Sequence, residues 1–520
     1  MRRDFGDYQT PPALVAAVLD ALGPIGERWP RVLEPTCGRG HFLAGLIGLA
    51  TPPREIQGIE IQAVHLDQAR ALARGAGPVR VEFTRASLFD VDLRRDLHWG
   101  RRGPLLVVGN PPWVTNAELG LLASGNLPRK RNVRGLRGID ARTGASNFDL
   151  AEAVWLKLLD ELAAEEPTIA LLCKRSVARN VLAFAERADL PVAAASIHRV
   201  DAQKWFRAAV DACLLRVTLG ARREERAGRV PVFPDLRARE PESVLGFVRG
   251  RLIADLGAYE ARAFADGICP LTWRQGVKHD AAPIMELART SGSEPWRNKL
   301  GEVVDVEPDW IFPLLKGADL AESSPVATRR GVIVTQRRIG QDTRALECQA
   351  PRLWGYLMRH AAAFARRKSS IYRDQPPFAL FGVGPYSFAR FKVAVSGLHK
   401  APRFHAVGPV AGRPVLLDDT SYFLACDTAE QAALVAALWN DPIALDLLRA
   451  LTFRDAKRPI TKGVLQRVDL KAIVGRADRA ALLARAEADR ERLAGAPARP
   501  AFPWPEALES MLGASSRIGR

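Results

Sequence analysis

The chain has 520 residues, which is too long for a single ordinary hydrophobic core and suggests two to four domains. Its 75 Lys and Arg residues against 58 Asp and Glu residues leave a formal charge of +17, which favours a polyanionic partner over a merely solvated basic surface. No apolar run approaches the ~20 residues that span a bilayer, and the N-terminus lacks the apolar core of a signal peptide, so we expect a soluble cytoplasmic protein without a membrane partner.

Strand-like and helix-like segments alternate through roughly the first two-fifths of the chain, as in consecutive βαβ units. Helices are predicted over 41–50, from near Ala63 onward, and over 148–162. The predicted strands are short apolar or alternating runs, at 31–33, 56–60, 79–83, 105–108, 168–172 and 213–219. This order predicts an α/β fold with a doubly wound, mostly parallel, Rossmann-like sheet.

The composition shifts to Arg, Glu and Pro over 221–242, which indicates a linker. Beyond it the pattern is irregular, with short apolar runs, aromatic patches and helices near 430–451, as expected of a separate α+β domain. Residues 476–493 carry Ala, Arg, Glu and Leu at helical spacing, and a Pro-rich stretch follows. We therefore predict a first domain over 1–230, a second over 231–475, and a helical and Pro-rich C-terminal tail over 476–520.

Glycines and acids follow successive predicted strands. The loop Glu34-Pro35-Thr36-Cys37-Gly38-Arg39-Gly40 comes after the first strand, and its two glycines allow a tight turn and close approach of a ligand to the backbone. It matches neither the dinucleotide loop nor the phosphate cradle of ATP-binding proteins. Glu60 ends the second strand, where it could accept ribose hydroxyls, and Asp90 follows the third, where it could hold an adenine amino group. Each acid alone is commonly a helix cap or a surface group, but together they describe an adenosine pocket without pyrophosphate, which S-adenosylmethionine fits.

The tetrapeptide Asn110-Pro111-Pro112-Trp113 follows the apolar strand 105–108. In an open α/β sheet, ligands bind just beyond the carboxyl ends of the strands. Asn supplies a carbonyl acceptor, the prolines leave their own carbonyls free, and Trp offers a flat face, a combination suited to a planar amine. A Pro-rich turn is the alternative for four residues taken alone, and the other motifs favour the functional interpretation.

With these motifs in this order, the chain resembles the γ-type N6-adenine DNA methyltransferases of bacterial restriction–modification systems. Gly6-Asp7-Tyr8-Gln9-Thr10-Pro11-Pro12 resembles the motif in which a Thr-Pro-Pro turn closes over the methionine end of the cofactor, and the resemblance spans roughly residues 6–219. It implies a Rossmann-like methyltransferase sheet, a target-recognition role for the second domain, and S-adenosylmethionine as cofactor. The implied cofactor-binding residues are Thr10, Glu34, Pro35, Thr36, Gly38, Gly40, Glu60, Asp90 and Phe148.

The resemblance also implies aromatic contacts. Phe148, at the start of the helix after the tetrapeptide, would pack beside the cofactor adenine, and Phe206 would touch the displaced base together with Trp113. An aromatic side chain at either position could equally belong to the core. Weaker matches to target-recognition regions indicate kinship without assigning a base, and they lie at 273–280, 313–317, 382–388 and 418–420.

The implied reaction moves a methyl group to N6 of an adenine that is flipped out of duplex DNA. The catalytic residues would be Asn110, Pro111, Pro112 and Trp113: two oxygens accept the amino hydrogens and the indole stacks on the base. No metal is required, and the six widely spaced cysteines show no metal-ligand spacing. A basic segment after the tetrapeptide is predicted to contact DNA phosphates through Arg129, Lys130, Arg131, Arg134 and Arg137.

Two other interpretations remain open. The chain could methylate an adenine in structured RNA, or it could be a non-catalytic DNA-binding subunit that keeps the fold. Methylation of protein glutamine fits poorly, because enzymes of that kind resemble the catalytic half alone. The sequence does not reveal the recognised DNA site, the oligomeric state, or whether a separately encoded restriction endonuclease is a partner.

Overall fold

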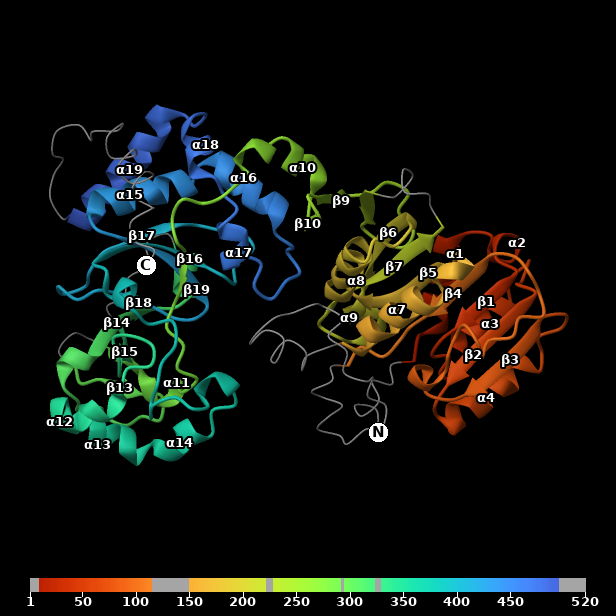
Figure 1. The fold of residues 1–520 in the computed structure, drawn as a ribbon, viewed down its shortest axis with the longest axis horizontal. Coiled ribbons are helices and arrows are strands. Elements are labelled where there is room, and N and C mark those ends of the chain that lie inside the picture. The colour runs from red at the N-terminus through yellow and green to blue at the C-terminus, as the bar shows by residue number, and fades with distance from the viewer. Residues whose placement is uncertain (1–8, 115–148, 221–227, 291–293, 323–328, 495–520) are drawn as a thin grey trace. The chain divides into compact units, whose positions relative to one another are not determined.

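The computed structural model describes residues 9–114, 149–220, 228–290, 294–322 and 329–494. The chain forms two compact units, Met1–Gly257 and Ala258–Arg520. In Figure 1 the first runs from red to yellow-green and the second from green to blue. The helix α10 (Leu256–Glu260) spans the boundary in sequence.

A single large sheet organises the first unit, in the order β10-β9-β8-β6-β7-β5-β4-β1-β2-β3. Strands β3, β2, β1, β4 and β5 are parallel neighbours, and β7 lies antiparallel between β5 and β6. This is the predicted α/β sheet. Its strands are β1 (Arg31–Glu34), β2 (Glu55–Glu60), β3 (Arg80–Arg85), β4 (Leu105–Gly109), β5 (Thr168–Lys174), β6 (Val192–Asp201), β7 (Asp211–Leu219), β8 (Arg229–Phe233), β9 (Ser243–Val248) and β10 (Arg251–Ile253).

Helices between the strands bury the sheet. Alternate strand residues such as Val32, Ile56 and Leu106 pack in one core with Leu14 and Phe42 of the first helices. Burial on both faces explains why β2 and β4 are buried along their whole length, as is typical of parallel sheets. The helices are α1 (Pro12–Leu22), α2 (Ile25–Arg28), α3 (His41–Ile47), α4 (Ala63–Ala73), α7 (Leu150–Glu161), α8 (Arg175–Arg187) and α9 (Ala202–Phe206), with the short turns η1 (Leu88–Asp90) and η3 (Ala163–Glu165).

The predicted linker over 221–242 is wrong where the structure describes it. Strand β8 lies within it, and it pairs in parallel with β6 and antiparallel with β9. Val230 and Val232 are buried while Arg229 is exposed, so the segment alternates as an ordinary strand does. The Arg, Glu and Pro residues around it hide that alternation in the composition. The first unit consequently extends to Gly257 and not to the predicted boundary at 230.

The second unit is the expected α+β structure, built on two sheets. A four-stranded sheet has the order β11-β19-β16-β17 and a five-stranded sheet the order β13-β12-β15-β14-β18. Their strands are β11 (Arg274–Gln275), β12 (Glu286–Ala288), β13 (Arg297–Asn298), β14 (Ile311–Leu315), β15 (Arg330–Ile333), β16 (Phe391–Ser396), β17 (His405–Val407), β18 (Leu416–Leu417) and β19 (Ser421–Cys426).

The predicted C-terminal tail begins inside this second unit. Helix α19 packs on α15. Arg485 of α19 bonds at 3.1 Å to Asp441, the residue that caps α16, and Arg492 donates to the Ala406 carbonyl. None of the described helices is long and apolar enough to cross a membrane. The helices are α11 (Ala282–Met285), α12 (Leu346–Gln349), α13 (Pro351–Arg359), α14 (Ala361–Ala365), α15 (Ala429–Trp439), α16 (Pro442–Leu451), α17 (Lys462–Leu465), α18 (Leu470–Val474) and α19 (Arg479–Ala494).

Candidate functional site

A pocket of about 880 Å³, open mouth included, lies in the first unit at the carboxyl ends of β1, β2 and β4. We call it the strand-end pocket. Segments that are far apart in sequence line it, namely the glycine loop after β1, the end of β2, the turn before η1, the tetrapeptide and one face of α7. This is the edge at which the sequence predicted a ligand. Its lining includes the predicted residues Thr10, Glu34, Pro35, Thr36, Gly38, Glu60, Asn110 and Pro112.

Gly38 and Gly40 shape the loop that follows β1. Both have positive φ, +52° and +81°, which strains any residue with a Cβ atom. A Cβ on Gly40 would lie 3.0 Å from the Ala69 Cα in α4, whereas a Cβ on Gly38 would meet only the Gln9 side chain, at 3.1 Å. Gly38 lines the strand-end pocket, and Gly40 begins α3 outside its lining. The two glycines therefore differ in their surroundings: Gly38 faces the strand-end pocket, and Gly40 packs against α4.

Backbone amides orient the Glu60 carboxylate. One oxygen accepts from the Gly38 N–H at 2.9 Å and the other from the Gln62 N–H at 2.8 Å. The side chain is only 7% exposed, so these bonds tie the end of β2 to the glycine loop. Each carboxylate oxygen can accept more than one hydrogen bond, which leaves capacity for the two hydroxyls of a ribose.

Glu34 is a buried acid on the wall of the strand-end pocket. Burial raises the pKa of Glu34 well above its ordinary value, although a backbone N–H at Leu43 opposes the shift, and Glu60 adds to it. Its Oε2 atom, like the Thr36 hydroxyl, is buried without a hydrogen-bond partner among the described residues. A buried carboxyl that has no partner for one oxygen is suited to a ligand that brings an amino or cationic group.

The segment before α1 connects the glycine loop to the tetrapeptide. Thr10 accepts from the Asn110 side-chain amide at 3.1 Å through its hydroxyl, and its carbonyl lies 2.7 Å from the His41 Nδ1 atom. Gln9 accepts from the Arg39 N–H at 3.3 Å. Thr10 thereby links two motifs that are a hundred residues apart in the sequence. It engages the NH2 group of the Asn110 amide and not its oxygen.

Trp113 is the last residue of the tetrapeptide, and β5 holds it in place. Its indole N–H donates to the Leu172 carbonyl at 3.3 Å. Its ring meets Phe206 edge to face, with centroids 5.1 Å apart and an interplanar angle of 70°. The structure therefore brings together the two aromatic residues named for base contact. Pro111 is buried and does not line the strand-end pocket.

Asp90 is placed differently from the prediction. It is exposed and does not line the strand-end pocket, whereas Ser87 and Phe89 do. The Ser87 hydroxyl accepts from the Phe89 N–H, and this bond starts the tight turn η1, at whose end Asp90 lies. The turn after β3 therefore contributes Ser87 and Phe89 to the pocket lining, and Asp90 lies outside it. Phe148 and the basic residues Arg129, Lys130, Arg131, Arg134 and Arg137 lie outside the described residues.

The sequence interpretation missed part of the lining. Leu150 and Val154, one helical turn apart on α7, form an apolar wall, and His41 and His65 add two imidazoles. The four-residue spacing of Leu150 and Val154 was a detectable signal for a buried face, but nothing in it distinguishes a pocket from a core. Among the described residues, no group of three or more His, Cys, Asp and Glu side chains could hold a metal ion.

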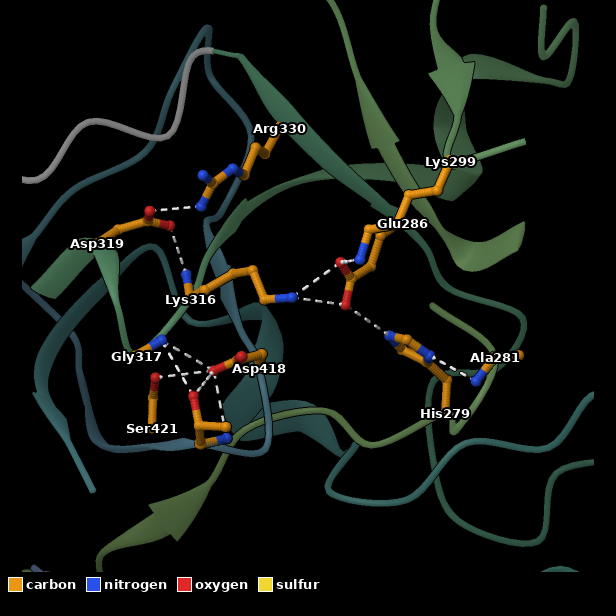
Figure 2. Close-up of polar contacts among 11 residues, drawn as sticks. His279, Ala281, Glu286, Lys299, Lys316, Gly317, Asp319, Arg330, Asp418 and Ser421 are labelled. Carbon is orange, nitrogen blue, oxygen red and sulfur yellow. Dashed lines mark hydrogen bonds and ion pairs between the residues drawn. The ribbon is translucent and has the colours of Figure 1, made fainter. Parts of the chain in front are cut away.

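In the second unit, the segments 273–280, 313–317 and 418–420 meet (Figure 2). One Asp418 carboxylate oxygen accepts from the Gly317 N–H, the Thr420 hydroxyl and the Ser421 hydroxyl, at 3.1, 2.6 and 3.0 Å. Lys316 donates to both oxygens of Glu286 at 2.9 Å. Polar side chains of these segments therefore form hydrogen bonds within the unit, which indicates a structural role.

Several basic side chains of the second unit are also engaged internally. The Arg337 guanidinium lies 4.5 to 5.7 Å from the centroids of Trp310, Phe312 and Phe388. Arg367 stacks on Tyr372 at 3.7 Å. These ring contacts hold the two arginines against the unit. Other basic side chains of the second unit are exposed, namely Arg338, Arg366, Lys368, Lys457 and Lys462.

Two of the known proteins that match this chain cover most of it, one by sequence and the other by fold. No protein-family model matches the chain. Over 471 residues it is 34% identical to the Type II methyltransferase M.NspV of Nostoc sp. (strain ATCC 29411 / PCC 7524), covering 90% of this chain and 97% of that protein. The solved structure of the Type IIL restriction-modification enzyme MmeI in complex with DNA covers 99% of this chain and 80% of that one, with a TM-score of 0.55 and 11% identity. This second likeness concerns the fold.

Proposed function

The chain belongs to the type II methyltransferases, and from this premise we propose that it methylates N6 of an adenine in duplex DNA. Its methyl donor is S-adenosylmethionine. The observation that carries the proposal is that Asn110 lines the strand-end pocket together with Glu34, Gly38 and Glu60. Trp113, three residues further along the chain, lies outside that lining and is held by Leu172 of β5.

We infer that the strand-end pocket would hold S-adenosylmethionine. Glu60 would hold the ribose hydroxyls, and Glu34 the amino group of the methionine portion, which supplies the cation that this buried acid otherwise lacks. Ser87 and Phe89 would face the adenine in the place predicted for Asp90. When bound, S-adenosylmethionine supplies an electrophilic methyl group on a sulfonium.

The residues of the tetrapeptide would activate the acceptor. The lone pair of an adenine amino group is delocalised into the ring, so the nitrogen is a poor nucleophile. The Asn110 side-chain oxygen and the Pro111 carbonyl would accept the two amino hydrogens and localise that lone pair. Trp113, held by Leu172 and Phe206, would stack on the base and fix its plane.

The target base must leave the duplex, which costs a few kcal/mol. Stacking on aromatic side chains returns about 1 to 3 kcal/mol per base. Contacts to DNA phosphates would supply the rest, through the net charge of +17 and through the basic segment 129–137, which lies outside the described residues. A solved structure of similar fold was determined in complex with DNA. We also propose a separately encoded restriction endonuclease as the cellular partner.

The decisive experiment incubates the purified protein with labelled S-adenosylmethionine and either duplex DNA or structured RNA, and then analyses the nucleosides. We expect label only in N6-methyladenine from DNA. Label in RNA alone would replace the proposal with the RNA interpretation, and label in a cytosine derivative would refute the assigned atom. Sequencing that detects methylated bases would then give the recognised site.

Asn110→Ala tests the role of the amide. We expect kcat to fall by about 10² to 10³-fold, the usual cost of removing one transition-state contact, while DNA binding stays largely intact. The matched control is Asn180→Ala, because Asn180 belongs to the same unit and its amide bonds to Glu152 away from the strand-end pocket. Equal transfer rates for Asn110→Ala and the unaltered protein would contradict the role.

A further inference from the structure

Lys174 touches the tetrapeptide from β5. It is the last residue of that strand, and its ammonium donates to the Trp113 carbonyl at 3.0 Å. Leu172, two residues earlier, accepts from the Trp113 indole. Both ends of Trp113, its ring and its backbone, are therefore anchored on one strand of the sheet.

The same ammonium reaches α7. It pairs with Asp149 Oδ2 at 2.8 Å, and the side chains of Lys174 and Asp149 are only 24% and 11% exposed. The other oxygen, Oδ1, caps α7 by accepting from the Ala151 N–H at 3.0 Å. The next residue, Leu150, lines the strand-end pocket and donates its N–H to the Val114 carbonyl at 2.9 Å.

We propose that Lys174 is a positioning residue for methyl transfer: its ammonium clamps the Trp113 carbonyl to the Asp149 cap of α7. This inference rests on the proposed function. The Lys174 ammonium thereby fixes two parts of the site to each other. They are α7, which forms one wall of the strand-end pocket, and Trp113, on which the target base would stack. Charge-assisted bonds to partly buried acceptors are short and directional, so the clamp sets the distance between the two walls.

The effect of losing the clamp should appear in the rate. A displacement of about 1 Å between reacting groups costs on the order of 10²-fold in rate. For Lys174→Met we expect kcat to fall by about 10- to 100-fold, with the KM for S-adenosylmethionine and the affinity for DNA changed by less than about threefold. Lys174→Arg, which keeps the charge and the donors, should restore part of the rate.

A second readout needs no activity. Hydrogen exchange at the Leu150 amide, which donates to the Val114 carbonyl, should quicken in Lys174→Met while the exchange of the β1 and β4 amides stays unchanged. Asp149→Asn keeps the cap oxygen and removes the charge. If the two residues act as one clamp, the double variant should lose no more rate than the worse single variant.

Lys157→Met is the matched control. Lys157 pairs with Glu161 on the same helix, one turn along, with a side chain that is 13% exposed. We expect its kcat to stay within about twofold of the unaltered protein, because an i,i+4 ion pair along one helix does not join that helix to the tetrapeptide.

Three outcomes would overturn the clamp. They are an unchanged kcat in Lys174→Met, an equal loss in Lys157→Met, or a lost rate accompanied by collapsed cofactor binding. Failure of the proposed function is distinguishable, because the unaltered protein would then place the methyl group on another atom or on RNA. The hydrogen exchange of the Leu150 amide, and the rates of the Lys174 and Lys157 variants on that other substrate, would still test the clamp.

Discussion

Glu34 makes the stability of the ligand-free protein depend on pH. Because burial raises its pKa above the ordinary 4.5, the folded protein keeps this proton at pH values where the unfolded chain has released it. The stabilisation is complete below about pH 4.5 and is lost as the pH rises through the folded pKa. Glu34→Gln cannot titrate, so its stability relative to the unaltered protein should increase with pH, by at most about 1.4 kcal/mol per pH unit.

Thermal melts of both proteins without cofactor, from pH 4 upward in steps of about one unit, would measure this gap. Differences between the two curves cancel the other titrating groups, which both proteins share. Curves that stay parallel at every pH would show that the carboxyl is already ionised in the folded protein. Glu34→Gln should also bind S-adenosylmethionine more weakly, which titration calorimetry would detect.

For single residues, the sequence predicted pocket-lining positions where a motif follows directly after a strand. Glu34, Gly38, Glu60 and Asn110 all line the strand-end pocket, because each lies at a strand end and parallel strands end at one edge. Asp90 does not line the pocket, because the turn that starts with the hydrogen bond from Phe89 to Ser87 leaves it exposed. Lys174 carried no signal, since its two acceptors are separated from it by 61 and 25 residues.

The glycine loop connects β1 to α3 beside the strand-end pocket. Its two glycines, Gly38 and Gly40, should respond differently to substitution. Gly40→Ala would push a Cβ atom against the α4 backbone at positive φ, so we expect a loss of stability of about 2 kcal/mol or more. Gly38→Ala meets only a flexible side chain, so the loss should be nearer 1 kcal/mol, with the main effect on cofactor affinity.

Urea unfolding would give both stabilities, and the midpoints should move at constant slope. Cofactor binding measured well below the midpoint separates affinity from stability. A larger loss of stability in Gly38→Ala than in Gly40→Ala would contradict the packing assigned to these two positions.

Prediction of the elements was best where large apolar side chains recur within a short segment. The strands predicted at 31–33, 56–60 and 105–108 are β1, β2 and β4. Strand β6 was missed, because its first half, Val192-Ala-Ala-Ala-Ser, has few large apolar side chains. In the sheet it pairs with β7 and β8. Strand β8 was taken for part of a linker. Both errors concern strands whose large apolar residues are diluted by alanine, arginine or proline, so the pattern of apolar residues does not identify them.

At the scale of the whole molecule, the division at Gly257 predicts which fragments fold. Fragment 1–257 should unfold cooperatively and bind S-adenosylmethionine. Fragment 1–230 lacks β9, β10 and most of β8, which leaves the β6 edge unpaired and prone to association. Light scattering and thermal melts of the two fragments would compare them. A stable, monomeric 1–230 fragment would restore the boundary first predicted from composition.

The position of β1 affects the order in which the protein can mature on the ribosome. This strand lies between β2 and β4, so it stays half paired until residues 105–109 have been synthesised, and β5 waits for β7 at residues 211–219. At typical translation speeds this interval lasts on the order of ten seconds. During that time the nascent chain presents incomplete apolar sheet edges, so its yield in cells should depend on chaperone supply more than the stability of the finished enzyme would suggest.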